Sequence, residues 1–161
     1  MPPTVVREVG PLGVGSLQYY VDNDGSHYFP LYETRPDLHP QLLCMAVFDL
    51  LVNNTDRKSG HVLLARSQNA NRVDHVWGID QGLCFHHDPK LRTVIWDFAH
   101  EPIPSELVDA VEPLVDEVPE GVAALLAPEE VAALGSRALR IVRLPWLPQL
   151  QSEFPYPWPL V

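Results

Sequence analysis

The sequence predicts an α+β domain that is mainly helical and carries a few short strands. Helical patterns cover three stretches, at residues 38–52, 104–118 and 128–142. Runs rich in β-branched and aromatic residues predict four strands, at residues 4–9, 16–21, 62–66 and 75–79. With 161 residues the chain is long enough to bury one core. Both kinds of element recur along the chain, so neither an all-helical nor an all-strand fold is expected.

The first 37 residues are predicted to be strand and loop. The strands at 4–9 and 16–21 are joined by a glycine-rich connection, residues 10–15. A strong turn signal, Asp22-Asn23-Asp24-Gly25, follows the second strand. Residues 26–37 show no clear period, and we expect irregular structure there.

The stretch 38–52 predicts the central helix of the domain. Apolar residues occupy nearly every face of it, which is typical of a helix buried on all sides. Asp49 is its main polar exception, and Asn53 and Asn54 are expected to end it. The domain should therefore be built around this segment.

Three further helices are expected in the second half of the chain. One begins near Ser105, a plausible cap, and runs to about residue 118, and a short one follows Pro119. The last begins at Pro128, with glutamates in its first turn. Its basic residues are Arg137, Arg140 and Arg143. A favourable interaction with the helix dipole suffices to explain them, although contact with an anionic substrate is the other interpretation.

Composition excludes several classes of function. The formal net charge of −10 disfavours binding to nucleic acid, because no broad face is available to neutralise phosphates. No apolar run approaches the roughly 20 residues that span a bilayer, and no secretory signal pattern is present, so we expect a cytoplasmic protein without a transmembrane segment. Cys44 and Cys84 are expected to act as small buried hydrophobic residues. The oligomeric state stays open.

The polar loop Asn53–His61 is the first candidate for chemistry. A carboxylate at Asp56 can orient a hydroxyl nucleophile and accept its proton. Lys58, two positions on, can reach a transferring phosphoryl group, and a neutral imidazole at His61 can bind a divalent ion. The alternative is a helix end followed by a solvated turn, because the same residue types favour turns.

The second candidate is Asp80, which follows the predicted strand at 75–79. A carboxylate at this position can bind Mg²⁺ that bridges nucleotide phosphates, and Gly82 allows a sharp backbone turn after it. The alternative is an aspartate that merely closes a turn at a strand end. Asp80 lies 24 positions after Asp56, with a predicted strand pair between them. This ordered pair of carboxylates predicts phosphoryl transfer from a metal-bound nucleotide.

The stretches Phe48–Arg57 and Val76–Phe85 together resemble the catalytic core of phosphatidylinositol 3-/4-kinases. Among these kinases the type II 4-kinases are the most similar and HipA-type kinases are more distant. The chain resembles even more an actinobacterial group of uncharacterised proteins related to phosphatidylinositol kinases. The resemblance implies the C-terminal lobe of a protein-kinase-like fold, with ATP and Mg²⁺ or Mn²⁺ as cofactors. It implies that Asp56 is catalytic, that Asp80 and Gly82 belong to an Asp-x-Gly element that binds the cofactor, and that Asp80 and His61 hold the metal. Lys58 is expected to be catalytic because of its place two positions after Asp56. His61 stands where these kinases usually have asparagine.

The resemblance also implies three regions. Residues 1–25 would be remnants of the N-terminal lobe and hinge, residues 26–144 the C-terminal lobe, and residues 145–161 a tail rich in proline and tryptophan. Such kinases hold the nucleotide phosphates with a lysine of the N-terminal lobe, but the two lysines of this sequence are Lys58 and Lys90. We therefore expect most of that lobe to be missing, either because Met1 is not the true start or because the protein is a reduced relative.

Two functions follow from these patterns. The first is a kinase-like phosphotransferase that phosphorylates a lipid, protein or small-molecule hydroxyl and is incomplete as this chain alone. The second is a non-catalytic pseudokinase or interaction module, which the missing lysine and the unusual His61 favour. A third interpretation is a metal hydrolase built on His86, His87 and Asp88 together with His61, His75 and His100. It is disfavoured because the sequence has no His-Glu-x-x-His or Cys-x-x-Cys spacing and because adjacent histidines point apart on regular backbone.

Overall fold

The computed structural model describes residues 1–67, 74–149 and 155–161. Within these ranges helices are combined with two small antiparallel sheets, so the predicted α+β class is confirmed. The elements follow one another as β1 (Thr4–Arg7), β2 (Gly15–Gln18), α1 (Tyr28–Thr34), η1 (Pro36–Leu38), α2 (His39–Val52), η2 (Ser59–His61), β3 (Val62–Ala65), β4 (His75–Gly78), α3 (Ser105–Val111), α4 (Pro113–Asp116), α5 (Glu120–Ala123) and α6 (Pro128–Arg143).

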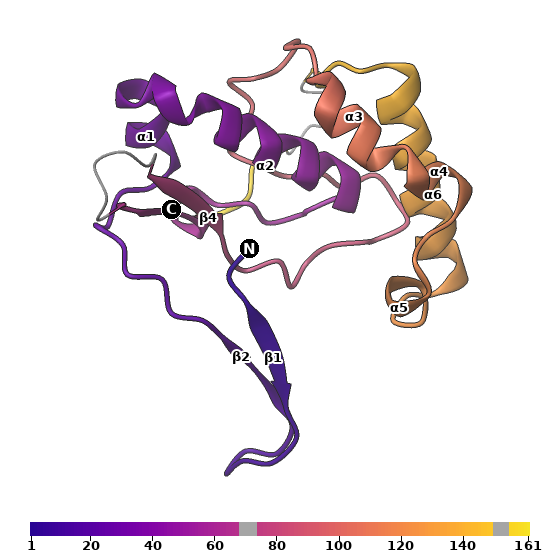
Figure 1. Cartoon of the computed structure of the whole chain (residues 1–161), viewed down its shortest axis with the longest axis horizontal. Coiled ribbons are helices and arrows are strands. Elements are labelled where there is room, and N and C mark those ends of the chain that lie inside the picture. Colours follow the sequence, from indigo (N-terminus) through magenta and orange to yellow (C-terminus); the bar gives the residue numbers. More distant parts are fainter. Residues whose placement is uncertain (68–73, 150–154) are drawn as a thin grey trace.

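Helix α2 is the centre of the fold, as its sequence predicts (Figure 1). It buries Leu42, Ala46 and Leu50 in the hydrophobic core, and it packs against both α6 and β4. Helix α6 is amphipathic and buries Leu134, Ala138 and Ile141, which lie on one face of the helix. Helices α3 and α4 then pack on α6. The apolar face of α6 therefore joins the second half of the chain to the central helix.

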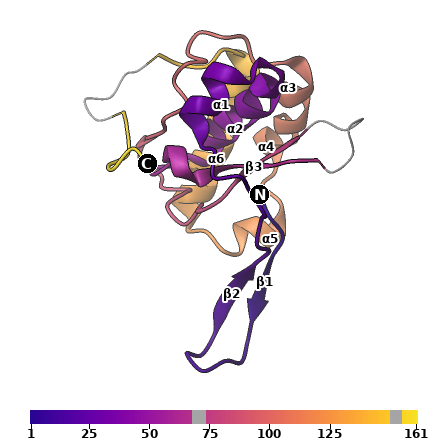
Figure 2. The same ribbon diagram turned by 90° about the vertical axis from the view of Figure 1, so that its left-hand side faces the viewer.

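Strands β1 and β2 form a hairpin that extends away from the rest of the molecule in both views (Figures 1 and 2). Thr4 pairs with Gln18 and Arg7 with Gly15. Many of its apolar side chains are exposed, among them Val5, Val6, Val9, Leu12, Val14, Leu17, Tyr19 and Tyr20. The two predicted strands are thus present, but they add little to the core.

Strands β3 and β4 form the second hairpin and lie against α2. Val62 pairs with Gly78 and Ala65 with His75, so the start of β3 lies beside the end of β4. Val62, Leu64 and Val76 are buried. The predicted polar loop between the two strands falls mostly at residues 68–73, outside the described residues. This register brings the loop before β3 next to the turn after β4.

The prediction of irregular structure at residues 26–37 is wrong, because α1 and η1 occupy most of this segment. Its sequence has weak helical propensity, with aromatic residues and Pro30 inside the helix. Tyr28 is fully buried and its ring stacks on that of Tyr32, one helical turn later. Tertiary packing of Tyr28 and Leu31 therefore forms a helix that local preference does not predict.

The helix expected between about 104 and 118 is divided. Helix α3 ends at Val111 and α4 begins at Pro113, whose ring and missing N–H favour the first turn of a new helix. Ser105 makes no side-chain cap, since Pro104 occupies the cap position. Within the described ranges, no helix is long and apolar enough to cross a membrane.

The prediction that both cysteines are buried is wrong for Cys44. The Cys44 side chain is exposed on the surface of α2, whereas Cys84 is half-buried. Because the sequence of α2 is apolar on nearly every face, it does not show which side the neighbouring elements leave uncovered.

Candidate active site

The loop after α2 is anchored by an ion pair that is closed to solvent. The carboxylate of Asp49, in the last turns of α2, and the guanidinium of Arg57 are both 0% exposed. Arg57 donates to Asp49 through Nη2 at 2.9 Å and through Nε at 3.0 Å. Its remaining nitrogen, Nη1, donates to the backbone oxygen of Ile79 at 2.9 Å. One buried arginine therefore connects the central helix, the loop after it and the end of β4.

Asp49 also receives hydrogen bonds from two neutral side chains. Asn54 Nδ2 donates to Asp49 Oδ1 at 3.0 Å, and Thr93 Oγ1 donates to Asp49 Oδ2 at 3.3 Å. Asn54 in turn accepts the backbone N–H of Asp56 on its Oδ1 at 3.0 Å. Because these polar groups are buried and paired, the loop backbone before Asp56 is held in one conformation.

Two later segments of the chain fix the outer side of the loop. Arg57 and Thr93 form an isolated parallel bridge, in which Arg57 N donates to the oxygen of Arg92 at 3.1 Å. Ser59 N donates to the oxygen of Leu160 at 2.7 Å, and Ser59 Oγ lies 2.6 Å from Nδ1 of His27. The backbone of this loop is thus positioned by residues from three distant parts of the sequence.

The two predicted catalytic residues lie side by side on this loop. Lys58 Nζ and Asp56 Oδ2 are 3.0 Å apart, and both side chains are about one-fifth exposed. The buried residue between them, Arg57, points inward, so Asp56 and Lys58 point toward the surface. The structure therefore presents a carboxylate and an ammonium group together at the edge of the solvent.

The turn after β4 brings Asp80 to the same region. Ile79 N donates to the oxygen of His61 at 2.9 Å, and His61 Nε2 lies 3.4 Å from Asp80 Oδ2. Asp80 has a φ of 55° and a side chain that is 62% exposed. Asp80 itself, and not Gly82, has the left-handed backbone at this turn. Residues held in this conformation are uncommon and cluster at functional sites.

The charges of Asp56, Lys58 and Asp80 all act on the pKa of His61. Burial lowers the pKa of His61, while the carboxylates of Asp80 and Asp56 oppose that effect and Lys58 reinforces it. His61 is therefore mainly neutral near pH 7, with Nδ1 accepting from the backbone N–H of Lys58 at 3.5 Å and Nε2 facing Asp80. The predicted residues Asp56, Lys58, His61 and Asp80 thus form one cluster at the surface, to which Gly82 is adjacent in sequence.

The donor set of this cluster fits a nucleotide-bound metal better than a metal enclosed by protein. Asp80 and His61 supply one carboxylate and one imidazole. Mg²⁺ in nucleotide sites commonly takes one or two protein carboxylates and completes its coordination with phosphates and water. Among the described residues, three possible ligand atoms do come together, but at a different place, residues 86–88.

That second group, His86, His87 and Asp88, has its ligand atoms within 4.8 Å of one another. The expectation that its histidines point apart is wrong, since the rings stack with centroids 4.5 Å apart. The segment lies in a loop and not in regular backbone. However, Lys90 Nζ lies 2.9 Å from His86 Nε2, and a cation in this position competes with a metal ion. We therefore do not assign this group as the site.

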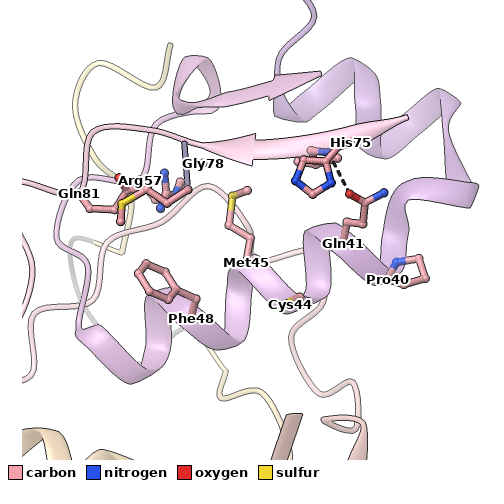
Figure 3. A pocket seen from close by; sticks show the side chains of 11 residues that line it. Pro40, Gln41, Cys44, Met45, Phe48, Arg57, His75, Gly78 and Gln81 are labelled. Carbon is pink, nitrogen blue, oxygen red and sulfur yellow. Dashed lines mark hydrogen bonds between the residues drawn. The ribbon is translucent and has the colours of Figure 1, made fainter. Parts of the chain in front are cut away.

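An apolar cavity of about 420 Å³ borders the turn that carries Asp80 (Figure 3). Met45 and Phe48 of α2 form one side, and His75 and Gly78 of β4 the other. Arg57 closes one end of it beside Gln81. The four clustered side chains do not line this cavity, so their candidate chemistry takes place at the surface next to it.

The anchoring residues are those that sequence reasoning missed. Asp49 was noted only as the polar exception in an apolar helix, and Arg57 only as part of a motif. A single carboxylate among the buried residues of an otherwise apolar helix does signal a buried partner, because an unpaired buried charge is very costly. The sequence does not show which of the arginines is that partner.

Arg137 has a role that the dipole of its own helix does not explain. It lies in the middle of α6 and donates from Nε to the oxygen of Leu51, at the end of α2, at 2.7 Å. A cation at the C-terminal end of a helix is favourable, so Arg137 stabilises α2 and not α6.

Comparison with known proteins gives two similarities. The chain is 34% identical over 197 aligned residues to Protein Rv2133c of Mycobacterium tuberculosis, covering 99% of this chain and 68% of that protein. It is 31% identical over 104 residues to Phosphatidylinositol 4-kinase gamma 3 of Arabidopsis thaliana, covering 63% of this chain and 18% of that protein. No family model matches the chain. The second similarity supports a link to lipid kinases over part of the chain.

Proposed function

The chain belongs to the family of Protein Rv2133c of Mycobacterium tuberculosis, and we propose that it acts as a kinase-like phosphotransferase. In this proposal it transfers the γ-phosphoryl group of ATP to a hydroxyl group of a lipid, protein or small molecule. The similarity to a plant phosphatidylinositol 4-kinase makes a lipid hydroxyl the first acceptor to test. Because that similarity covers 18% of the plant protein, its full activity is not transferred to this chain.

One observation carries the proposal. Two separate loops, one before β3 and one after β4, pair Asp56 with Lys58 and Asp80 with His61, and the charges of Asp56 and Lys58 act on the pKa of His61. Their backbones are joined directly by the bond from Ile79 N to His61 O. Phosphoryl transfer needs this combination, because one carboxylate must act on the nucleophile while another acts on the metal.

The residues of the chain have distinct roles in the reaction. Asp56 orients the acceptor hydroxyl and takes its proton as the hydroxyl oxygen bonds to the γ-phosphorus. The bond from that phosphorus to the β–γ bridging oxygen breaks, and ADP leaves with that oxygen. Lys58, paired with Asp56 in the structure, turns to the transferring phosphoryl group and neutralises its charge.

Asp80 and the neutral His61 would hold a divalent cation, Mg²⁺ or Mn²⁺. When bound with the nucleotide, that cation neutralises charge on the β- and γ-phosphate oxygens. The carboxylate of Asp80 is well exposed and is therefore accessible to a metal–nucleotide complex. The left-handed backbone conformation of Asp80 fixes the position of its carboxylate on the turn after β4.

The test is calorimetric titration of Mg-ATP into the chain, with Asp80→Asn as the variant. We expect weak binding, with a dissociation constant of about 1 mM. Asp80→Asn should remove the part of the affinity that depends on Mg²⁺. Asp88→Asn is the matched control, because its carboxylate is similarly exposed, at 58%. Equal affinities for the wild-type protein and Asp80→Asn would exclude Asp80 from the metal role.

A turnover experiment separates the enzyme from a pseudokinase. ATP consumption is measured with vesicles that contain phosphatidylinositol, and Asp56→Asn should lower the rate at least about a hundredfold. A rate that is the same with Asp56→Asn would remove the base assignment. Binding of Mg-ATP without any turnover would favour the non-catalytic alternative.

A further inference from the structure

A second cavity, of about 680 Å³, lies on another part of the molecule. Leu50 of α2, His87 and Leu91 of the loop that follows β4, and Arg137 and Arg140 of α6 contribute to its lining. Its volume is within the range that small-molecule sites have. None of the four clustered residues Asp56, Lys58, His61 and Asp80 lines it. It is therefore a separate feature, and its interpretation does not depend on the proposed phosphotransfer.

Two arginines give this cavity its charge. Arg137 and Arg140 are one turn apart on α6, so their side chains lie on the same face. Among the residues that the structure describes, the cavity lining contains no carboxylate. Neither arginine has an ion pair with any part of the chain that the structure describes. In a protein with a net charge of −10, two cations that line one cavity without a counter-charge need an explanation.

The hydrogen bonds of both guanidinium groups are incomplete. Nη2 of Arg137 and Nη1 of Arg140 are buried and have no hydrogen-bond partner within the described residues. The other bonds of Arg137 go to neutral backbone oxygens, those of Leu51 and His86. Burial also lowers the pKa of Arg137. A buried donor without a partner is destabilising, and a buried charge without a counter-charge more so.

The remainder of the lining is mainly apolar. Trp96 and Leu91 form part of the wall. The indole N–H of Trp96 already donates to the oxygen of Pro155 at 3.0 Å, so Trp96 has no further donor to offer. The cavity thus combines a cationic side with an aromatic and aliphatic side.

We propose that this cavity binds a small organic anion, whose phosphate or carboxylate group pairs with Arg137 and Arg140 while its apolar body lies against Trp96 and Leu91. Arginine suits both anions, because its planar fork of donors matches their oxygens. The ligand supplies a counter-charge that the described residues of the chain do not provide. Asn53 also lines the cavity and begins the loop that carries Asp56, so the bound anion is next to the base of that loop.

The test is calorimetric titration of the whole chain with phenyl phosphate, benzoate, inorganic phosphate and benzyl alcohol. Phenyl phosphate or benzoate should bind with a dissociation constant of about 1 mM or below, and the tighter of the two identifies the preferred anion. Inorganic phosphate should bind more weakly, because it cannot use the apolar wall. Benzyl alcohol should not bind measurably, because it carries no charge. If benzyl alcohol binds as tightly as the aromatic anions, or if none of the four binds, the proposal is overturned.

Variants locate the binding. Arg140→Gln should weaken binding of the preferred aromatic anion about tenfold or more, because it removes a charged hydrogen-bond donor. Arg143→Gln, an exposed arginine one turn further along α6, is the matched control and should change the affinity less than about twofold. Ala133→Leu narrows the cavity without altering either arginine and should also weaken binding, which keeps the test decisive if Arg140→Gln does not fold. Equal affinities for Arg140→Gln and Arg143→Gln would contradict the site.

Discussion

The Asp49 carboxylate on α2 and the Arg57 guanidinium on the following loop meet at 2.9 Å where neither side chain reaches solvent. Arg57 stands in the sequence between the two residues proposed to act on the substrate. Its side chain points into the protein while those of Asp56 and Lys58 point out. The position of the Asp56–Lys58 pair therefore depends on a bond between two buried residues.

Removing the charge of Asp49 should strongly destabilise the protein. Asp49→Asn leaves Arg57 as a buried cation without a counter-charge, and the expected loss is about 3–5 kcal/mol in the free energy of unfolding. Urea denaturation of both proteins measures it. The matched control is Asp37→Asn, which removes the exposed pair of Arg35 and Asp37 and should cost less than about 1 kcal/mol. A similar loss of unfolding free energy in the two variants would show that the buried pair stabilises the protein no more than the exposed pair does.

Asn53 should contribute to stability through both its backbone and its side chain. It has a left-handed φ of 54°, which asparagine tolerates better than most residues. Its side chain donates to the oxygens of His86 and Asp88 and accepts from Lys90 N. We expect Asn53→Ala to lower the free energy of unfolding by about 2 kcal/mol or more. Asn53→Gly removes the three side-chain hydrogen bonds but still allows a positive φ. If Asn53→Gly were as stable as the wild type, these bonds would not contribute to the free energy of unfolding.

Ionisation of Tyr28 should lower the free energy of unfolding at alkaline pH. Burial raises the pKa of Tyr28 well above its usual value, and its hydrogen bond to Asp97 at 2.8 Å adds to the effect. Because the folded-state pKa is above that of the unfolded chain, this contribution is complete below about pH 10 and is lost as the pH rises further. At pH 7, Tyr28→Phe should cost about 1 kcal/mol.

Urea denaturation at pH 7 and above pH 10 tests this dependence. The cost of Tyr28→Phe should shrink at the higher pH, since phenylalanine does not ionise. Tyr20→Phe, at an exposed tyrosine, controls for the chemical change and should leave the pH dependence of the wild type intact. A cost for Tyr28→Phe that is equal at the two pH values would contradict the prediction.

The two cysteines should differ in reactivity. Burial raises the pKa of Cys84 to about 11, so few of its thiols are ionised at pH 8, whereas the Cys44 side chain is exposed. Iodoacetamide at pH 8 should therefore alkylate Cys44 first, which mass spectrometry of digested protein can show. Cys44→Ser should remove the fast phase. Faster labelling of Cys84 would mean that the loop around it opens readily.

The elements that could be predicted are those whose residue pattern is local and does not depend on contacts with distant segments. The long apolar run predicted α2, the proline and glutamates at the start and the arginines near the end predicted α6, and the glycine-rich connection predicted the loop between β1 and β2. Helix α1 was not predictable, because the burial of Tyr28 and Leu31 depends on partners far away in the sequence. The exposure of Cys44 depends in the same way on how neighbouring elements pack, whereas the break at Pro113 has a local cause.

The same distinction applies to the candidate site. Asp56 and Asp80 were selected from their positions after a helix and after a strand, and their spatial grouping agrees with that reasoning. Their catalytic roles remain predictions. The pairing of Asp49 with Arg57 was not predictable, because charge alone does not choose among the arginines of the sequence. Nor does sequence periodicity show that Arg137 reaches Leu51 on another helix.

The bonds that close the loop around Asp56 also bear on the order of events during protein synthesis. The N–H of Ser59 is held by the oxygen of Leu160, and that of Thr93 by the oxygen of Pro155. The loop therefore obtains these backbone partners only from residues that the ribosome adds long after Ser59. Much of the hydrophobic core is also made late, since Val111, Ala138 and Ile141 belong to it. Closing the core and closing the loop around Asp56 thus both wait for the second half of the chain.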